Sequence, residues 1–388
     1  MLRARRWFRG LPVLVLILVA PACTRDAPVA PDSVAEQGAQ DPERVAGDLA
    51  LAARWIDHEQ SIALQAGGAD AGSVLSGNRL VGRETIIGDV VHYTFEVRVG
   101  AGAYDKISLH RVVREPIPYR PIRTAHNVLF LHGDAKDFEG VYLPGLKSPR
   151  QPDDFGIAVY LAQNDVDVWG LDQGWCLVPE GESNLGFMAD WGMQRQVNDL
   201  STGLTIARVL RGISGSGGGK MILGGFSSGA ATGFALLNQE AALPPLLRNA
   251  AAFIPIDYGL KTDDPTWAGF SCAQAERLQG LIEQGQYASF NPFVVFGRPA
   301  LMDPDGPSPY IPGLTNLQAA IAVGASPSAP GITYHLVAGS FESGLPVGLQ
   351  YTPVDVWVDF MNYAPPWEPN AFMRDVYRSA CGQEDVPW

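Results

Sequence analysis

The stretch that decides the predicted fold is KMILGGFSSGAATGFALL, residues 220 to 237. Its first four residues, Lys220 to Leu223, predict a strand, and Ala230 to Leu237 predict a helix. Between them, Gly225-Phe226-Ser227-Ser228-Gly229 fits the pattern G-x-S-x-G. The pattern needs glycine because the chain turns sharply from strand to helix, where larger side chains would collide with their neighbours. We therefore expect an exposed hydroxyl at Ser227.

The surrounding sequence alternates short apolar runs with helical patterns. The predicted strands are Asn127 to Leu131, Val166 to Leu171 and Ala251 to Ile256. Between the strands, Phe155 to Ala162 has a helical pattern, and apolar residues recur every three or four positions at Met193, Val197, Leu200, Leu204 and Ala207. This order predicts an α/β fold whose mostly parallel sheet is covered by helices on both faces.

Two further segments alternate apolar with polar residues. Val90 to Val99 and Ile107 to Val113 flank a glycine-containing turn. Alternation with a period of two is typical of a strand with one solvated face. We expect these segments to form an antiparallel pair of half-exposed edge strands.

Residues 85 to 258 resemble the α/β-hydrolase family, in the form of a bacterial serine esterase or lipase. The likeness is carried by Leu131-His132-Gly133-Asp134, by Asp172-Gln173-Gly174 and by the Gly225 to Gly229 turn around Ser227. It implies that Ser227 is a nucleophile and that the backbone N–H groups of Ser228 and Asp134 form an oxyanion hole. It also implies a structural hydrogen-bonding role for His132, and a cap or insertion after the sixth core strand.

The resemblance leaves the acid and the base open. The family order is serine, acid, histidine, and His335 is the single histidine after Ser227. One interpretation takes His335 as the base and Asp257, at the end of its predicted strand, as the acid. The other takes residues 259 to 388 as a cap and helical insertion in a truncated chain that lacks the last two core strands. An inactive hydrolase-like protein is the third possibility.

The N-terminus predicts export. A basic segment, Arg3 to Arg9, precedes the apolar run Leu11 to Val19 and the small residues Ala20-Pro21-Ala22, so residues 1 to 22 are the expected signal peptide. Cys23 follows directly, as in bacterial lipoproteins, which predicts lipidation there; ordinary cleavage after Ala22 is the alternative. Residues 23 to 41 have the composition of a disordered tether, and residues 42 to 258 form the predicted core. We expect a lipid-anchored protein of the cell envelope or periplasm, or otherwise a secreted one.

The composition argues against several classes of binding partner. The net charge is -13, from 28 basic and 41 acidic residues, so the summed field repels nucleic acid. No C-x-x-C pair or nucleotide fingerprint occurs and the six histidines are scattered, so we expect no metal and no cofactor. Cys176, Cys272 and Cys381 can form at most one disulfide among themselves. Membrane contact is expected only through an anchor at Cys23.

The resulting hypothesis is a serine hydrolase that cleaves small carboxylic esters through an acyl-enzyme. Aromatic residues between 259 and 330 favour an apolar acyl or alcohol group, or else form the core of that region: Trp267, Phe270, Phe290, Phe293, Phe296 and Tyr310. The alternative is a non-catalytic, hydrolase-like envelope lipoprotein, or an incomplete hydrolase chain without its acid and histidine.

Overall fold

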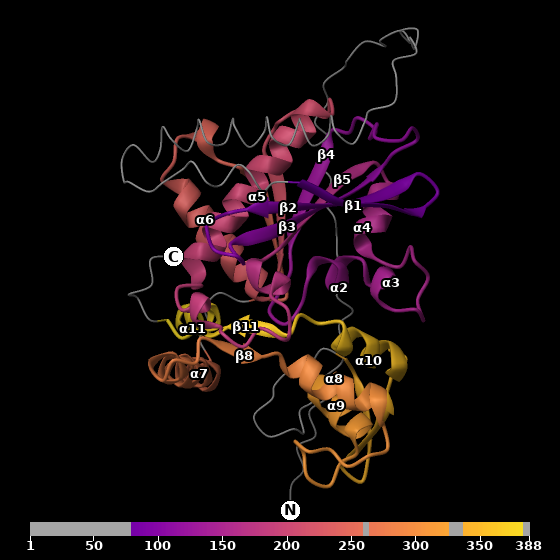
Figure 1. Cartoon of the computed structure of the whole chain (residues 1–388), viewed down its shortest axis with the longest axis vertical. Coiled ribbons are helices and arrows are strands. Elements are labelled where there is room, and N and C mark those ends of the chain that lie inside the picture. Colours follow the sequence, from indigo (N-terminus) through magenta and orange to yellow (C-terminus); the bar gives the residue numbers. More distant parts are fainter. Residues whose placement is uncertain (1–78, 259–263, 326–336, 383–388) are drawn as a thin grey trace, which may run out of the picture. The chain divides into compact units, whose positions relative to one another are not determined.

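The computed structural model describes residues 79–258, 264–325 and 337–382. The predicted signal peptide, Cys23, the tether and His335 lie outside these ranges. Seven strands form one sheet in the order β1-β2-β3-β5-β4-β6-β7 (Figure 1). They are β1 (Arg79–Ile87), β2 (Val90–Arg98), β3 (Lys106–Arg114), β4 (His126–Leu131), β5 (Val166–Asp172), β6 (Met221–Phe226) and β7 (Ala250–Ile256).

The sheet is parallel in the half that carries the sequence motifs. Strand β4 lies between β5 and β6 and pairs with both in parallel, and β6 pairs in parallel with β7. The other half is antiparallel, from β1 through β2 and β3 to β5. The predicted α/β fold with a mostly parallel core is confirmed, because the four strands of that core arise from apolar runs separated by helices.

Helices cover both faces of the sheet, as predicted. On β4, Leu129 and Leu131 join the apolar cluster of α5 (Met193–Ile213) and α6 (Ser228–Ala241). The alternate residues Val128 and Phe130 join the cluster of α4 (Ile157–Gln163). Successive strand side chains point to opposite faces, so one short strand anchors both helical layers.

The prediction that β2 and β3 are half-exposed edge strands is wrong. β1 pairs with β2 on the outside, β3 pairs with β5, and most residues of both strands are buried. Their polar residues are paired inside the protein: Arg111 binds Asp167 through two hydrogen bonds of 2.8 Å, and His92 contacts His110. Alternation thus arises here from buried polar pairs, which sequence alone cannot distinguish from a solvated face.

The remaining elements precede α4 or follow β7. Before α4 come α2 (Phe138–Tyr142) and α3 (Pro144–Lys147). After β7 come α7 (Pro265–Glu283), β8 (Ala288–Phe290), α8 (Pro292–Met302), α9 (Asn316–Ala325), β9 (Gly339–Glu342), β10 (Leu345–Leu349), α10 (Val354–Asn362), β11 (Trp367–Pro369) and α11 (Asn370–Ala380). Strand β8 pairs with β11 and β9 with β10, both antiparallel. The boundaries of a cap within this region remain a prediction.

Several of the region's aromatic side chains form its own core. Phe293 and Phe296 are buried among α8, α9 and α10, where Phe293 meets Trp357 edge to face. Trp267 and Phe270 stack on each other in α7, and Phe270 contacts Tyr377 of α11. The buried rings of Phe293 and Phe296 favour the interpretation of a packed core over that of a substrate-facing lining, whereas Trp267 is exposed.

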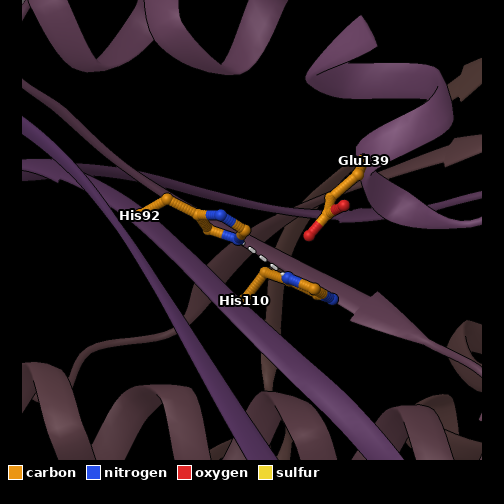
Figure 2. Close-up of side chains that lie close together, drawn as sticks. All are labelled: His92, His110 and Glu139. Atoms are coloured by element: carbon orange, nitrogen blue, oxygen red, sulfur yellow. Dashed lines mark hydrogen bonds between the residues drawn. The ribbon is translucent and has the colours of Figure 1, made fainter. Parts of the chain in front are cut away.

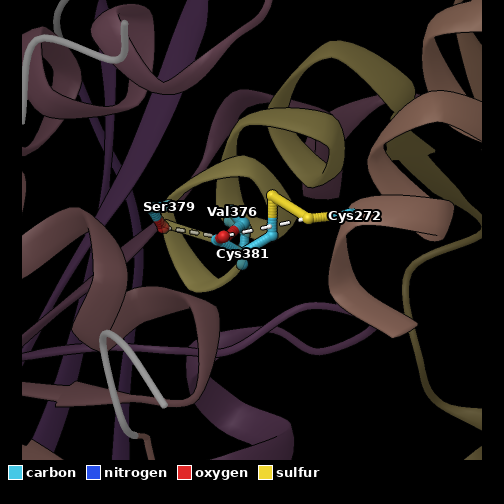
Figure 3. Close-up of a disulfide and its surroundings, with 4 residues drawn as sticks. All are labelled: Cys272, Val376, Ser379 and Cys381. Atoms are coloured by element: carbon cyan, nitrogen blue, oxygen red, sulfur yellow. Dashed lines mark hydrogen bonds between the residues drawn. A yellow bond between two sulfur atoms is a disulfide. The ribbon is translucent and has the colours of Figure 1, made fainter. Parts of the chain in front are cut away.

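A disulfide joins α7 to the end of α11. Cys272 and Cys381 are bonded, with their Cα atoms 5.1 Å apart (Figure 3), and Cys176 is not part of a disulfide. This pairing agrees with the expectation that Cys176, Cys272 and Cys381 form at most one disulfide.

Within the described ranges, no helix is both long and apolar enough to cross a bilayer.

Candidate functional site

The turn predicted around Ser227 is present. Strand β6 ends at Phe226 and α6 begins at Ser228, so Ser227 alone links them, with φ 52° and ψ -122°. A Cβ atom at Gly225 would lie 2.7 Å from the carbonyl oxygen of Gly229, and one at Gly229 would lie 2.3 Å from that of His132. Both glycines are therefore required for the close approach of the backbones, as the motif predicts.

The segment after β4 packs directly on Ser227. A Cβ atom at Gly133 would lie 2.9 Å from that of Ser227, and Ser227 Oγ donates a hydrogen bond of 3.2 Å to Asp134 Oδ1. Ser228 is the first residue of α6, whose initial N–H groups lack partners within the helix. The structure thus brings Ser227, Ser228 and Asp134 together, and it adds the carboxylate of Asp134, for which only a backbone role is predicted.

Three residues with a strained backbone lie at this edge of the sheet. Ala135, Ser227 and Asp257 have φ values of 60°, 52° and 52°, in the left-handed region that disfavours residues with a side chain. They follow the ends of β4, β6 and β7, which are neighbours in the parallel half of the sheet. Strain of this kind costs about 1–3 kcal/mol per residue and clusters at functional sites.

Asp257 lies beside the turn. The residue before it, Ile256, is in register with Phe226. The carbonyl oxygen of Ile256 accepts a 2.9 Å hydrogen bond from the N–H of Ser227. The side chain of Asp257 is exposed. The predicted acid therefore reaches the same edge as Ser227, whereas the predicted base, His335, lies outside the described residues.

His132 is a structural hydrogen-bonding residue, as expected. It is fully buried; its Nδ1 donates to the carbonyl oxygen of Gly133 at 2.7 Å, and its Nε2 accepts from the N–H of Gln173 at 3.2 Å. These partners define the neutral tautomer with its proton on Nδ1. His132 therefore ties the end of β4 to the end of β5, and it has no nitrogen free to act on Ser227.

Glu368, in β11, is a candidate site residue that sequence reasoning missed. Its Oε1 atom is buried without a hydrogen-bond partner among the described residues. Burial, together with the negative charge of Asp134, raises the pKa of Glu368 to about 8, although the backbone N–H of Ala135 donates a hydrogen bond to it. Two carboxyl groups therefore lie next to the Ser227 turn, and at neutral pH Glu368 is mostly protonated.

The sequence contains no signal for this contact, because the two residues are far apart in the chain and Glu368 lies in a short Trp-Glu-Pro segment that matches no motif. Tyr258 belongs to the same surroundings: burial raises the pKa of its phenol, and the charge of Asp134 adds to the shift. Asp134 thus accepts a hydrogen bond from Ser227, and its charge raises the pKa values of Glu368 and Tyr258.

Buried polar contacts fix the segment after Asp134. Asn291 Nδ2 donates to the carbonyl oxygens of Ala135, at 3.1 Å, and Pro365, at 2.6 Å. Lys136 is buried; its Nζ atom donates to the carbonyl oxygen of Phe360 and lies 3.2 Å from the centre of that ring. Burial lowers the pKa of Lys136 well below its ordinary value. These contacts hold the backbone next to Ser227 in place.

Comparisons with known proteins identify the fold. No family model and no curated protein sequence matches the chain. A solved structure of a candidate lipase from Sulfolobus solfataricus is 18% identical, covers 76% of this chain and 79% of its own, and has a TM-score of 0.52. A mutant epoxide hydrolase from Vigna radiata is 13% identical over 75% and 74% of the two chains, with a TM-score of 0.36. Together with the strand order and the strained serine turn, the first likeness shows that this chain has the α/β-hydrolase fold.

Proposed function

We propose that the protein is a serine hydrolase that cleaves carboxylic esters through an acyl-enzyme. The observation that carries the proposal is Ser227, a strained residue that alone links β6 to α6 in an α/β-hydrolase fold. A strand-to-helix turn of this kind presents a hydroxyl at the N-terminus of a helix, where the helix dipole favours developing negative charge. Ser227 is half-buried and not sealed in the interior, which supports the proposal.

The proposed reaction has two steps. Ser227 Oγ attacks the ester carbonyl and loses its proton, a C–O bond forms, and the alcohol leaves with a proton while the acyl group stays on the serine. Water then attacks the acyl-serine and releases the acid. The backbone N–H groups of Ser228 and Asp134 are the proposed donors to the oxyanion in both steps.

Proton transfer is assigned through the resemblance. His335 is the proposed base and Asp257 the proposed acid, and the position of Asp257 beside the Ser227 turn supports the second assignment. In the free protein, the hydroxyl of Ser227 instead donates to Asp134. An ester that reaches Ser227 has to displace this hydrogen bond, so we expect Asp134 to influence the reactivity of the serine.

Labelling with a fluorophosphonate tests the proposal. The reagent reacts with activated serine hydroxyls, so the wild-type chain should gain one adduct that peptide mapping places on Ser227. Ser227→Ala should gain none, and Ser201→Ala, on α5, should label as the wild type does. A folded wild-type chain that stays unlabelled overturns the proposal. A series of p-nitrophenyl esters of increasing acyl length then measures the proposed preference for apolar groups.

The second candidate is a non-catalytic protein or an incomplete hydrolase with this fold. It is favoured by one observation among the described residues, namely that the hydroxyl of Ser227 donates to the carboxylate of Asp134. Absence of labelling, together with the circular dichroism of a folded chain, supports this candidate.

Export and lipidation at Cys23 are a separate proposal, which the mass of the mature N-terminus tests. An unmodified Cys23 excludes the lipid anchor.

A further inference from the structure

A pair of buried histidines lies away from the serine turn. His92 of β2 and His110 of β3 are 1% and 2% exposed. Their ring planes are nearly parallel, at 17° with centres 5.1 Å apart, and His92 Nε2 faces His110 Nδ1 across 2.9 Å. Figure 2 shows Glu139 of α2 directed toward the same place; one donor atom from each of the three residues lies within 4.8 Å of the other two.

Each histidine is oriented by a carboxylate on its outer side. His92 Nδ1 lies 3.0 Å from Glu84 Oε1, and His110 Nε2 lies 2.9 Å from Asp172 Oδ2. Histidines that bind metals usually donate their second ring N–H to a carboxylate in this way, which fixes the tautomer. The other nitrogen of each ring, His92 Nε2 and His110 Nδ1, is turned away from these carboxylates, and the two nitrogens face each other.

The local charge also favours a cation. Glu84, Glu139 and Asp172 surround the pair, and Asp137 lies close to Glu139 in the chain. Lys147 supplies one positive charge, at 2.8 Å from Glu139 Oε2 and 3.4 Å from Asp137 Oδ2. Acidic side chains outnumber this ammonium group, and a divalent ion bound by the two rings and Glu139 would offset negative charge.

We propose that His92, His110 and Glu139 form a binding site for Zn²⁺. Two imidazole nitrogens and one carboxylate oxygen are a ligand set that zinc takes, with water in the fourth position. Zinc–nitrogen bonds of about 2.0–2.1 Å at a tetrahedral angle place the nitrogens about 3.3 Å apart, so the rings need to separate by about 0.4 Å and to tilt until both nitrogens point at the ion. The carboxylate of Glu139, now within 4.8 Å of the nitrogens, has to move closer as well. A bound ion would link β2 and β3 to α2 and stabilise the fold.

A second cluster, His132, Asp172 and Cys176, is less suited to a metal. Both ring nitrogens of His132 already have backbone partners, and burial raises the pKa of the Cys176 thiol well above its ordinary value. Asp172 belongs to this cluster and also contacts His110, so a test has to distinguish the two places by substitutions at other residues.

The test is zinc binding to the tag-free chain after removal of metals with a chelator. We expect one Zn²⁺ per chain by titration calorimetry, a higher melting temperature with zinc, and the visible spectrum of tetrahedral Co²⁺ when cobalt replaces it. Glu139→Gln should weaken binding at least tenfold. Glu84→Gln, at an exposed carboxylate behind His92, should weaken it by about 10–100-fold, the range for outer partners of metal ligands.

Glu96→Gln is the matched control. Glu96 and Glu139 each have 24% of the side chain exposed and each pair with a lysine at 2.8 Å, but Glu96 faces neither histidine. Its substitution should leave zinc binding unchanged, as should Ser227→Ala, so the result is independent of the proposed hydrolase activity. A wild-type chain that binds no zinc, or a Glu139→Gln variant that binds it as tightly as the wild type does, overturns the proposal.

Discussion

Replacing Glu368 with glutamine should stabilise the folded chain at neutral pH. Burial, together with the charge of Asp134, raises the pKa of Glu368 from an ordinary 4.5 to about 8. Between these values the folded chain holds a proton that the unfolded chain releases, so the free energy of unfolding falls by about 1.4 kcal/mol for each pH unit above 4.5. At pH 7 the accumulated cost is about 3 kcal/mol, and glutamine removes it because an amide does not ionise.

Urea unfolding followed by tryptophan fluorescence measures this effect. The gain of Glu368→Gln over the wild type should be about 3 kcal/mol at pH 7 and below about 1 kcal/mol at pH 5. Glu276→Gln, at an exposed position of α7, is the control and should change stability little at either pH. A gain of equal size at both pH values would contradict the reasoning, because an ionisation effect must depend on pH; so would a loss of stability at pH 7.

Four other substitutions test the packing. Gly229→Ala places a Cβ atom 2.3 Å from a backbone oxygen and should cost about 3 kcal/mol or more, whereas Gly280→Ala, in α7 with no atom within 4 Å of the new Cβ, should gain about 0.5–1 kcal/mol; urea unfolding measures both. Cys272→Ser opens a disulfide loop with a sequence separation of 109 residues and should cost up to about 4 kcal/mol, and an unchanged melting temperature would contradict this estimate. Asp167→Asn leaves two buried arginines without their shared carboxylate and should cost about 3–5 kcal/mol; a loss below about 1 kcal/mol would show that water or other groups compensate.

Sequence reasoning was most reliable where the structure depends on neighbours in the chain. The helix containing Met193 and Val197, the four parallel strands and the turn at Ser227 follow from periodicity and from the steric needs of Gly225 and Gly229. These are local properties, so a single sequence contains them. The predicted strand of four residues before Ser227 is longer in the structure, since β6 continues to Phe226.

The prediction failed where distant residues interact. His92 and Arg111 look like solvent-facing positions until their buried partners are known, and β1, which covers the edge of β2, has no apolar run to mark it. Glu368 is a candidate site residue only because β11 lies near Asp134. The assignments of Asp257 and His335 stay predictions.

The bond between Cys272 and Cys381 closes the chain into a covalent ring. Elements from α8 through α11 all lie within that ring, between the two sulfur atoms. A protease that cuts the backbone once inside it would therefore leave the protein in one piece. The two fragments would separate only after a thiol reductant opens the ring.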